Sequence, residues 1–143
     1  MYAKGYLVAS SKAGRQATFY SRPLLDFLPL AYDRDFATQQ TITLGEILTE
    51  KIVTAQTYAK PVYVATGKQD AVFCGNGSRE LGEPDCGQGQ SSQVAAMKDF
   101  FPSVPANKFG YFAQPNAGHS HQLHYTAPAA FVKINSFLQQ QGL

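Results

Sequence analysis

The sequence predicts an α/β fold in which parallel strands are covered by helices. Between residues 61 and 141, two β-rich runs alternate with two runs whose apolar residues recur at helical spacing. The resulting order is strand, loop, helix, strand, loop, helix, which is typical of a parallel sheet with helices on its faces. Hydrophobic residues make up 44% of the 143 residues, which is enough for a packed core and argues against a disordered chain.

The first 57 residues carry weaker signals than the rest of the chain. The run GYLVAS at residues 5–10 predicts a short strand. Residues 22–36 are apolar but contain Pro23 and Pro29, so we expect irregular structure with short helical turns. Thr43 and Glu46 have the spacing of a capping box. Apolar residues at helical spacing then predict a helix over residues 44–57; they are Leu44, Ile47, Leu48, Ile52 and Ala55.

The better-defined part of the chain begins with a strand. Val62–Thr66 is β-branched and aromatic, follows a proline and ends at Gly67, which predicts a strand buried on both faces. The loop that follows contains six glycines from Gly67 to Gly89. Loops of this length inside a compact domain usually carry function or are held by a cross-link.

Two helices and a second strand complete the pattern. Ser91 or Ser92 can cap a helix that runs to about Phe101. Residues 108–114 predict the second strand, and a final helix runs from Thr126 towards Gly142. Because two strands alone do not form a stable sheet, we expect part of the fold to be missing from these residues. The aromatic residues assigned to the core are Tyr111, Phe112, Phe131 and Phe137.

Composition excludes some classes of function. The formal net charge is +2, and the lysines and arginines are scattered singly, so nucleic-acid binding has no support. No stretch approaches the roughly 18 apolar residues of a membrane span. We therefore expect neither nucleic acid nor a membrane as a partner.

The glycine-rich loop carries two features of secreted proteins. Cys74 and Cys86 form a candidate disulfide, with two free thiols as the alternative. Asn76 begins an Asn-Gly-Ser sequon and is a candidate glycosylation site. Together they favour a secreted, extracellular protein. The N-terminus, however, has no apolar segment of signal-peptide length.

The candidate chemistry lies beyond the two strands. Asp70 follows the first strand and His119 follows the second. Functional residues of open α/β sheets gather beyond the carboxyl ends of the strands, so neighbouring strands would bring the two together. A carboxylate that fixes an imidazole is the acid–base half of a nucleophilic triad. The alternatives are an ordinary turn carboxylate and an ordinary loop histidine.

Two stretches resemble the α/β-hydrolase family. KPVYVATGKQDAVFC, residues 60–74, resembles its seventh strand and the turn that bears its acid. NAGHSHQLHYTAPAAFVKINSFL, residues 116–138, resembles its histidine loop and last helix. The order of acid and then histidine also matches. The resemblance implies that Asp70 is the catalytic acid, that His119 is the base and that no cofactor is needed.

The remainder of the chain resembles other parts of the same family. GYLVASSKAGRQATFY and TITLGEIL resemble the cap region of its secreted fungal members. We therefore divide the chain into a cap-like helical region, residues 1–57, and the C-terminal part of an α/β-hydrolase domain, residues 58–143. The fold class expected is a partial α/β-hydrolase fold, in which C-terminal parallel strands and their helices are joined to part of a cap.

The serine nucleophile of that family has no counterpart in the chain. It should precede Asp70 in a Gly-x-Ser-x-Gly elbow, and no such pattern occurs. We expect it in a missing N-terminal part, so that this chain is truncated and inactive alone. The resemblance implies that the complete enzyme hydrolyses a small ester or amide acyl substrate through a covalent intermediate.

The other two histidines leave different functions open. His119, His121 and His124 are spaced as in some binuclear metallohydrolases, but Leu123 stands where those motifs carry an aspartate. We expect no metal site. His121 is expected to be solvated or to line the pocket mouth, His124 is expected to pack against the final helix, and both are possible pocket residues. Two alternatives to the hydrolase remain. One is a small metal-binding or metallohydrolase module that uses the three histidines, and the other is a non-catalytic remnant that associates with itself or a partner through an exposed sheet edge.

Overall fold

The computed structural model describes residues 6–7, 29–38, 42–43, 53–70, 72–74, 85–87 and 92–143, and the account below concerns these residues. At its centre lie two parallel strands, β3 (Val62–Gly67) and β4 (Phe109–Gln114). Their register pairs Val62 with Phe109 and continues to Gly67 with Gln114. Among the described residues, β3 and β4 pair with no other strand.

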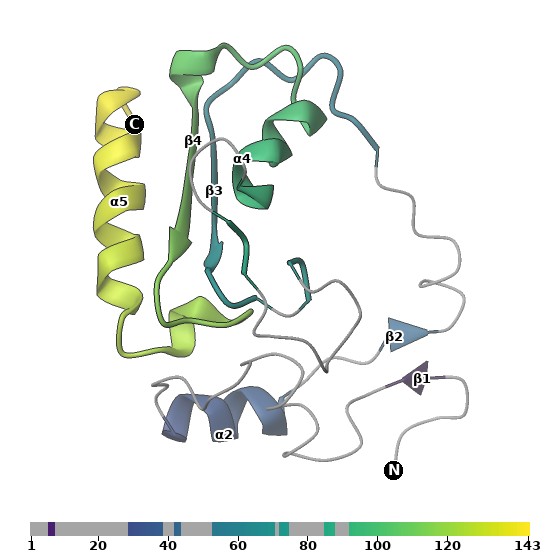
Figure 1. Cartoon of the computed structure of the whole chain (residues 1–143), viewed down its shortest axis with the longest axis vertical. Helices are drawn as coiled ribbons and strands as arrows, with labels where there is room; N and C mark the ends of the chain where they lie inside the picture. Colours follow the sequence, from purple (N-terminus) through teal and green to yellow (C-terminus); the bar gives the residue numbers. More distant parts are fainter. Residues whose placement is uncertain are drawn as a thin grey trace.

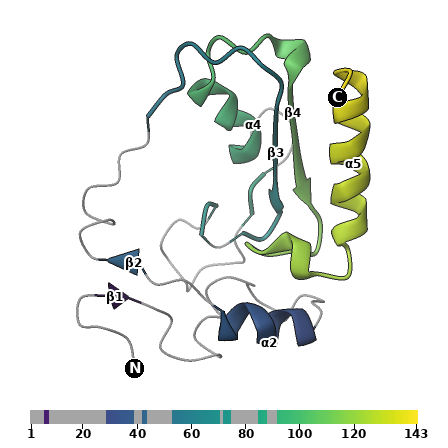
Figure 2. The same cartoon turned by 180° about the vertical axis from the view of Figure 1, so that it is seen from behind.

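Two helices lie on opposite sides of this strand pair, as both views show (Figures 1 and 2). They are α4 (Gln93–Ala96) and α5 (Ala127–Gln140). The predicted α/β arrangement of parallel strands and flanking helices is therefore confirmed for this part of the chain.

Helix α5 packs on the strands through an aromatic contact. The rings of Tyr63 on β3 and Phe137 on α5 have centroids 4.9 Å apart. Gly110 on β4 makes room for this pair, because a Cβ there would lie 2.5 Å from the Tyr63 ring. Burial raises the pKa of the Tyr63 hydroxyl. The contact fixes how α5 lies across both strands.

Helix α4 begins as predicted but is shorter. The Ser92 side chain accepts hydrogen bonds from the amides of Val94 and Ala95 and caps the helix. After Ala96 the chain tightens into a 3₁₀ helix, Met97–Phe100. Its end is closed by a bond from the Phe101 amide to the Lys98 carbonyl, 2.9 Å long.

The core of the described residues is small. Val94 packs with Cys74 and Cys86, and the strand residues Val64 and Ala113 lie against this cluster. The prediction that all four aromatic residues are core is wrong for two of them, since Tyr111 is 40% and Phe131 is 48% exposed. Phe131 follows the buried Ala130 on α5, at the edge of the stripe that faces the strands. The first four residues of β3 are also only half-buried.

The N-terminal part differs more from the predictions. The short strand β1 (Tyr6–Leu7) lies within the predicted one and pairs antiparallel with β2 (Ile42–Thr43). Residues 29–36, where we expected irregular structure with short helical turns, belong instead to one helix, α2 (Pro29–Ala37). Its proline is at the first helical position, where a missing N–H costs nothing. Residues 22–28 lie outside the described ranges.

The predicted helix over residues 44–57 is wrong at its C-terminal end. Residues 53–57 are not helical, and the Ala55 amide donates instead to the carbonyl of Phe100, 2.8 Å away. Residues 44–52 lie outside the described ranges.

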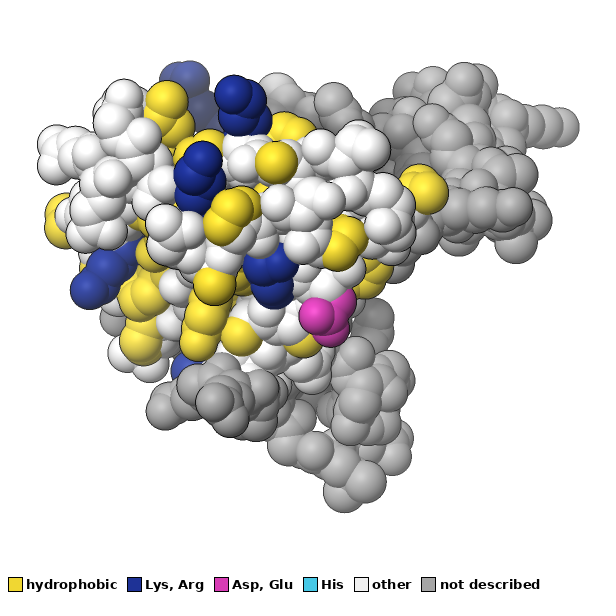
Figure 3. Space-filling view, turned by 90° about the horizontal axis from the view of Figure 1, so that it is seen from above, with side chains coloured by type: hydrophobic (Ala, Val, Ile, Leu, Met, Phe, Trp, Pro, Cys, Tyr) yellow, Lys and Arg dark blue, Asp and Glu magenta, His cyan; other side chains and the backbone are white. Residues whose placement is uncertain are grey.

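The surface agrees with the scattered charges of the sequence. On the face in Figure 3, Lys and Arg side chains are dispersed among hydrophobic and uncharged ones and form no stripe. No helix in the described part of the chain is long and apolar enough to cross a membrane.

Candidate active site

The structure brings Asp70 and His119 together. Because β3 and β4 are parallel, the loops that follow them leave the same edge of the sheet. The His119 Nδ1 atom lies 3.1 Å from Oδ2 and 3.2 Å from Oδ1 of Asp70. The predicted juxtaposition of these two side chains, 49 positions apart in sequence, is confirmed.

The Asp70 carboxylate is fully buried and surrounded by donors. Its Oδ2 accepts a hydrogen bond from the Thr66 hydroxyl, 2.5 Å away. Its Oδ1 accepts bonds from the amides of Val72 and Phe73, at 2.8 and 2.9 Å. Hydrogen-bond donors to both oxygens favour the ionised form of this buried carboxylate.

Opposing effects determine the pKa of Asp70. Burial alone would raise the pKa of this carboxyl group. Hydrogen bonds from His119, Thr66 and the Phe73 amide outweigh burial and lower the pKa below its usual value. Asp70 is therefore a permanent negative charge beside His119 at neutral pH.

The contact with Asp70 fixes the orientation of His119. The Nδ1–H group donates to Asp70, so Nε2 is the ring nitrogen that can accept a proton. The His119 side chain is 23% exposed, and the Phe73 ring lies with its centroid 5.0 Å from the imidazole. This geometry suits a general base in a partly sheltered position.

Gly67 allows the two loops to meet. A Cβ at this position would lie 2.1 Å from the carbonyl oxygen of Gly118 and 2.2 Å from that of Ala117. No side chain fits there, because both neighbours are backbone atoms. Sequence reasoning treated Gly67 only as the end of a strand, although a glycine directly before an acid-bearing turn was the available signal.

Gln69 joins the acid loop to the histidine loop. Its backbone N–H donates to the Ala117 carbonyl at 2.9 Å, and its side-chain Oε1 accepts from the Ala117 backbone N–H at 3.2 Å. The Lys68 amide adds a bond of 2.7 Å to the carbonyl of Gln114. Nothing in the sequence singles out Gln69, because its partner is 48 positions away.

The predicted disulfide is present between Cys74 and Cys86, with their Cα atoms 5.0 Å apart. Both residues also bind the acid loop through their backbones. The Cys74 amide donates to the carbonyl of Asp70 at 3.0 Å, and the Cys86 amide donates to that of Lys68 at 2.9 Å. The cross-link therefore supports the residues on either side of the carboxylate. Asn76, the predicted glycosylation site, lies outside the described residues.

The other two histidines have different surroundings. His124 is fully buried, and its carbonyl accepts the first amide of α5, that of Ala127. The Nε2 atom of His124 accepts a bond of 3.2 Å from the Gly118 amide. His121 is half-buried. Its pKa is lowered mainly by burial and also by the nearby His119, although the negative charge of Asp70 acts in the opposite direction. The predicted packing of the His124 side chain against the final helix stays a prediction, because burial alone does not show which element covers the ring.

The described residues contain no group of three His, Cys, Asp or Glu side chains that could hold a metal ion. The three histidines thus do not form a ligand cluster, because the Nδ1 of His119 faces Asp70 and the Nε2 of His124 faces a backbone amide.

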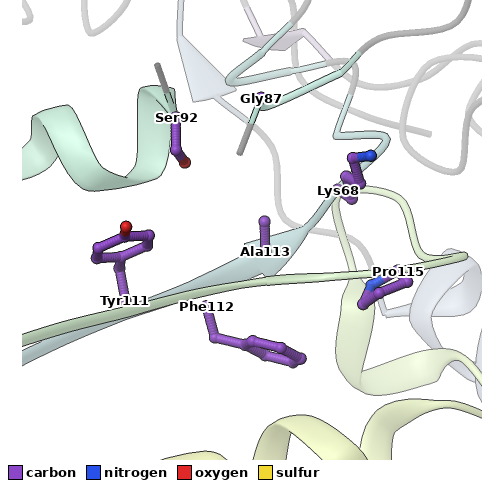
Figure 4. Close-up of a pocket in the computed structure, with 7 residues that line it drawn as sticks. All are labelled: Lys68, Gly87, Ser92, Tyr111, Phe112, Ala113 and Pro115. Atoms are coloured by element: carbon purple, nitrogen blue, oxygen red, sulfur yellow. The ribbon is translucent and has the colours of Figure 1, made fainter. Parts of the chain in front are cut away.

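A shallow cavity of about 190 Å³ lies on the α4 side of the strands. Figure 4 shows Tyr111 and Ala113 pointing to this side of β4 while Phe112 points to the other. Lys68 at its rim forms an ion pair with Asp85, 3.5 Å long. The lining residues are Lys68, Gly87, Ser92, Tyr111, Phe112, Ala113 and Pro115. They include neither Asp70 nor any histidine, so His121 and His124 do not line this cavity.

Comparisons with known proteins do not add to this picture. No family model matches the chain, and a search of curated proteins finds no match either. Any assignment of function must therefore rest on the chemistry of the site.

Proposed function

We propose that Asp70 and His119 are the acid and the base of a serine-type hydrolase of the α/β-hydrolase family, which acts on an ester or amide acyl substrate. The observation that carries the proposal is the contact of the His119 Nδ1 atom with a buried, fully hydrogen-bonded carboxylate. Such a pair leaves Nε2 to accept a proton and stabilises the imidazolium that results.

In this mechanism His119 transfers the protons of both half-reactions. Its Nε2 takes the proton of a serine hydroxyl as the oxygen attacks the acyl carbon, and then gives it to the leaving alcohol or amine. Water repeats the sequence on the acyl-enzyme and releases the acid. Asp70 stays ionised throughout, which its lowered pKa favours.

The serine belongs, in this proposal, to a segment outside the 143 residues. No Gly-x-Ser-x-Gly elbow occurs in the sequence. The chain by itself is therefore expected not to hydrolyse acyl substrates. The disulfide supports the further proposal of an extracellular protein, since such bonds persist in oxidising compartments.

The test begins with the native product, whose mass and peptides establish its length. A fluorophosphonate probe, which labels activated serines, is applied together with an activated ester as substrate. We expect labelling and turnover in the native product, with turnover falling by roughly 10³-fold or more in His119→Ala.

His121→Ala is the matched control, because it removes a neighbouring imidazole that the mechanism does not use. Full ester turnover in His119→Ala, or a native product with no labelled serine, contradicts the proposed function. Turnover that depends on His119 in the 143-residue chain alone contradicts the assignment of the nucleophile to another segment.

A further inference from the structure

The backbone that leads into His119 is held from two directions. Ala117 and Gly118 are both buried, and Ala117 is fully inaccessible. Gln69 binds both the amide and the carbonyl of Ala117. On the other side, the amide of Gly118 donates to the Nε2 atom of His124. These contacts hold the Asn116–Ala117 and Ala117–Gly118 peptide groups, which end one residue before His119.

The bond from Gly118 determines the chemical form of His124. A backbone amide can only donate, so Nε2 must carry a lone pair. His124 is therefore the neutral imidazole with its proton on Nδ1. Its side chain is fully buried, and a cationic ring at this position would leave the Gly118 amide facing another donor.

Gly118 needs support of this kind. Glycine has more backbone freedom than any other residue and offers no side chain for packing. A tilt of the Ala117–Gly118 peptide group would shift the Gly118 Cα and, through it, the Cα of His119. The contact of 3.1 Å between His119 and Asp70 would then lengthen, although neither of those side chains had changed.

We propose that His124 and Gln69 are positioning residues that hold the Ala117–Gly118 backbone so that His119 meets Asp70. Their catalytic consequence rests on the proposed function, but their effect on the geometry of His119 does not. Neither residue touches a reacting atom. The His124 side chain acts through the Gly118 amide, and the Gln69 side chain acts through the Ala117 amide. The bond to the Ala117 carbonyl comes from the Gln69 backbone and remains in any variant of the side chain.

The first test uses the wild-type chain and nitrogen-15 NMR of its three histidines. We expect His124 at neutral pH to have a protonated Nδ1 and an unprotonated Nε2 that correlates with the Gly118 amide. A proton on Nε2 of His124 overturns its assigned role without any variant.

The second test compares two substitutions of His124. In His124→Gln the side-chain oxygen reaches about as far as Nε2 and can accept the Gly118 amide, whereas His124→Leu has no acceptor. We expect hydrogen exchange at Gly118 to be roughly three- to tenfold faster in His124→Leu, as loss of one hydrogen bond implies. The Nδ1–H signal of His119 should weaken in the same variant and be retained in His124→Gln.

Gln69→Ala tests the other contact to the same backbone. Because Gln69 is only half-buried, truncating its side chain should disturb the fold less than a substitution of the fully buried His124. Its matched control is Gln122→Ala, at an exposed position of the histidine loop. We expect the His119 Nδ1–H signal to weaken in Gln69→Ala alone. An unchanged signal in folded Gln69→Ala overturns the role of Gln69, and an unchanged signal in folded His124→Leu overturns that of His124.

These outcomes are distinguishable from failure of the proposed function. If no serine is labelled in the native product but the NMR results hold, the positioning roles stand and the hydrolase assignment fails. If His119-dependent hydrolysis is found but His124→Leu and Gln69→Ala leave its NMR signal and kcat unchanged, the positioning roles fail and the hydrolase assignment stands.

Discussion

Gly67→Ala should separate the acid loop from the histidine loop. The new Cβ would lie 2.1 Å from the Gly118 oxygen, whereas real Cβ contacts are not shorter than 3.0 Å. The Gly118 backbone must therefore withdraw by about 1 Å, because the neighbouring Ala117 carbonyl is equally close and no flexible side chain can yield instead. The contact between His119 and Asp70, now 3.1 Å, would open to roughly 4 Å, beyond hydrogen-bonding distance.

Two quantities should change in this variant. Overpacking of this kind costs about 1–3 kcal/mol of unfolding free energy, measurable by urea denaturation. The Nδ1–H resonance of His119 should also lose the signature of its bond to Asp70. In the complete enzyme proposed above, a misplacement of about 1 Å would lower kcat by roughly 10²-fold.

Gly110→Ala is the matched control for this effect. Its Cβ would also be too close to its neighbours, at 2.5 Å from the Tyr63 ring and 3.0 Å from Phe137. Those are side chains at the α5 contact, away from Asp70, so stability should fall while the His119 resonance is unchanged. If folded Gly67→Ala shows the same His119 signature as Gly110→Ala, the reasoning about the crossing of the two loops is refuted.

Two further predictions concern the acid loop. Replacing Cys74 and Cys86 together by serine should lower the free energy of unfolding by about 3 kcal/mol. It should also weaken the Nδ1–H resonance of His119 that reports its bond to Asp70. Equal urea midpoints for the variant and the oxidised parent would contradict this prediction. Because the folded-state pKa of Asp70 is lowered from 3.8, its ionised form stabilises the fold above that pH, and this contribution is lost as the pH falls through the lower folded-state pKa. Asp70→Asn should therefore flatten the dependence of stability on acid pH below about pH 5, and an unchanged slope between pH 5 and 2 would show that Asp70 does not contribute.

The sequence predicted best what depends on local pattern and chain order. The β-branched run ending at Gly67, the helix cap at Ser92 and the order of Asp70 before His119 all carry signals within a few residues. Parallel pairing then made the acid–histidine contact a consequence of topology. The pairing of Cys74 with Cys86 could be predicted because they are the two cysteines of the sequence and flank one loop, and the structure contains this disulfide.

The errors have a common origin in non-local contacts. Residues 53–57 continue a helical pattern, but a bond from Ala55 to Phe100 holds them in another conformation. Pro29 was expected to interrupt a helix, but it is the first residue of α2. Proline is tolerated at that position, and the sequence alone does not show where the helix starts. Phe131 has the spacing of a core residue, yet the strands beneath α5 cover only the stripe beside it.

The supports of the candidate site were missed for the same reason. Gln69 and His124 act on the backbone of Ala117 and Gly118, and a bond to backbone leaves no trace in the identity of the partner residue. The need for glycine at position 67 is clear only from the structure, which places the backbone of Ala117 and Gly118 where a Cβ would lie. The reacting pair could thus be read from the sequence, whereas the residues that place it required the structure.

The way Asp70 is held has a consequence for library design. Its carboxylate is bound by the backbone amides of Val72 and Phe73, while their side chains are 42% and 70% exposed. Randomising these two positions would vary the side chain that lies against His119 at position 73 and a partly exposed one at position 72. The backbone donors that keep the carboxylate ionised would remain. Proline is the single residue to omit from such a library, because it alone lacks the N–H group on which the carboxylate depends.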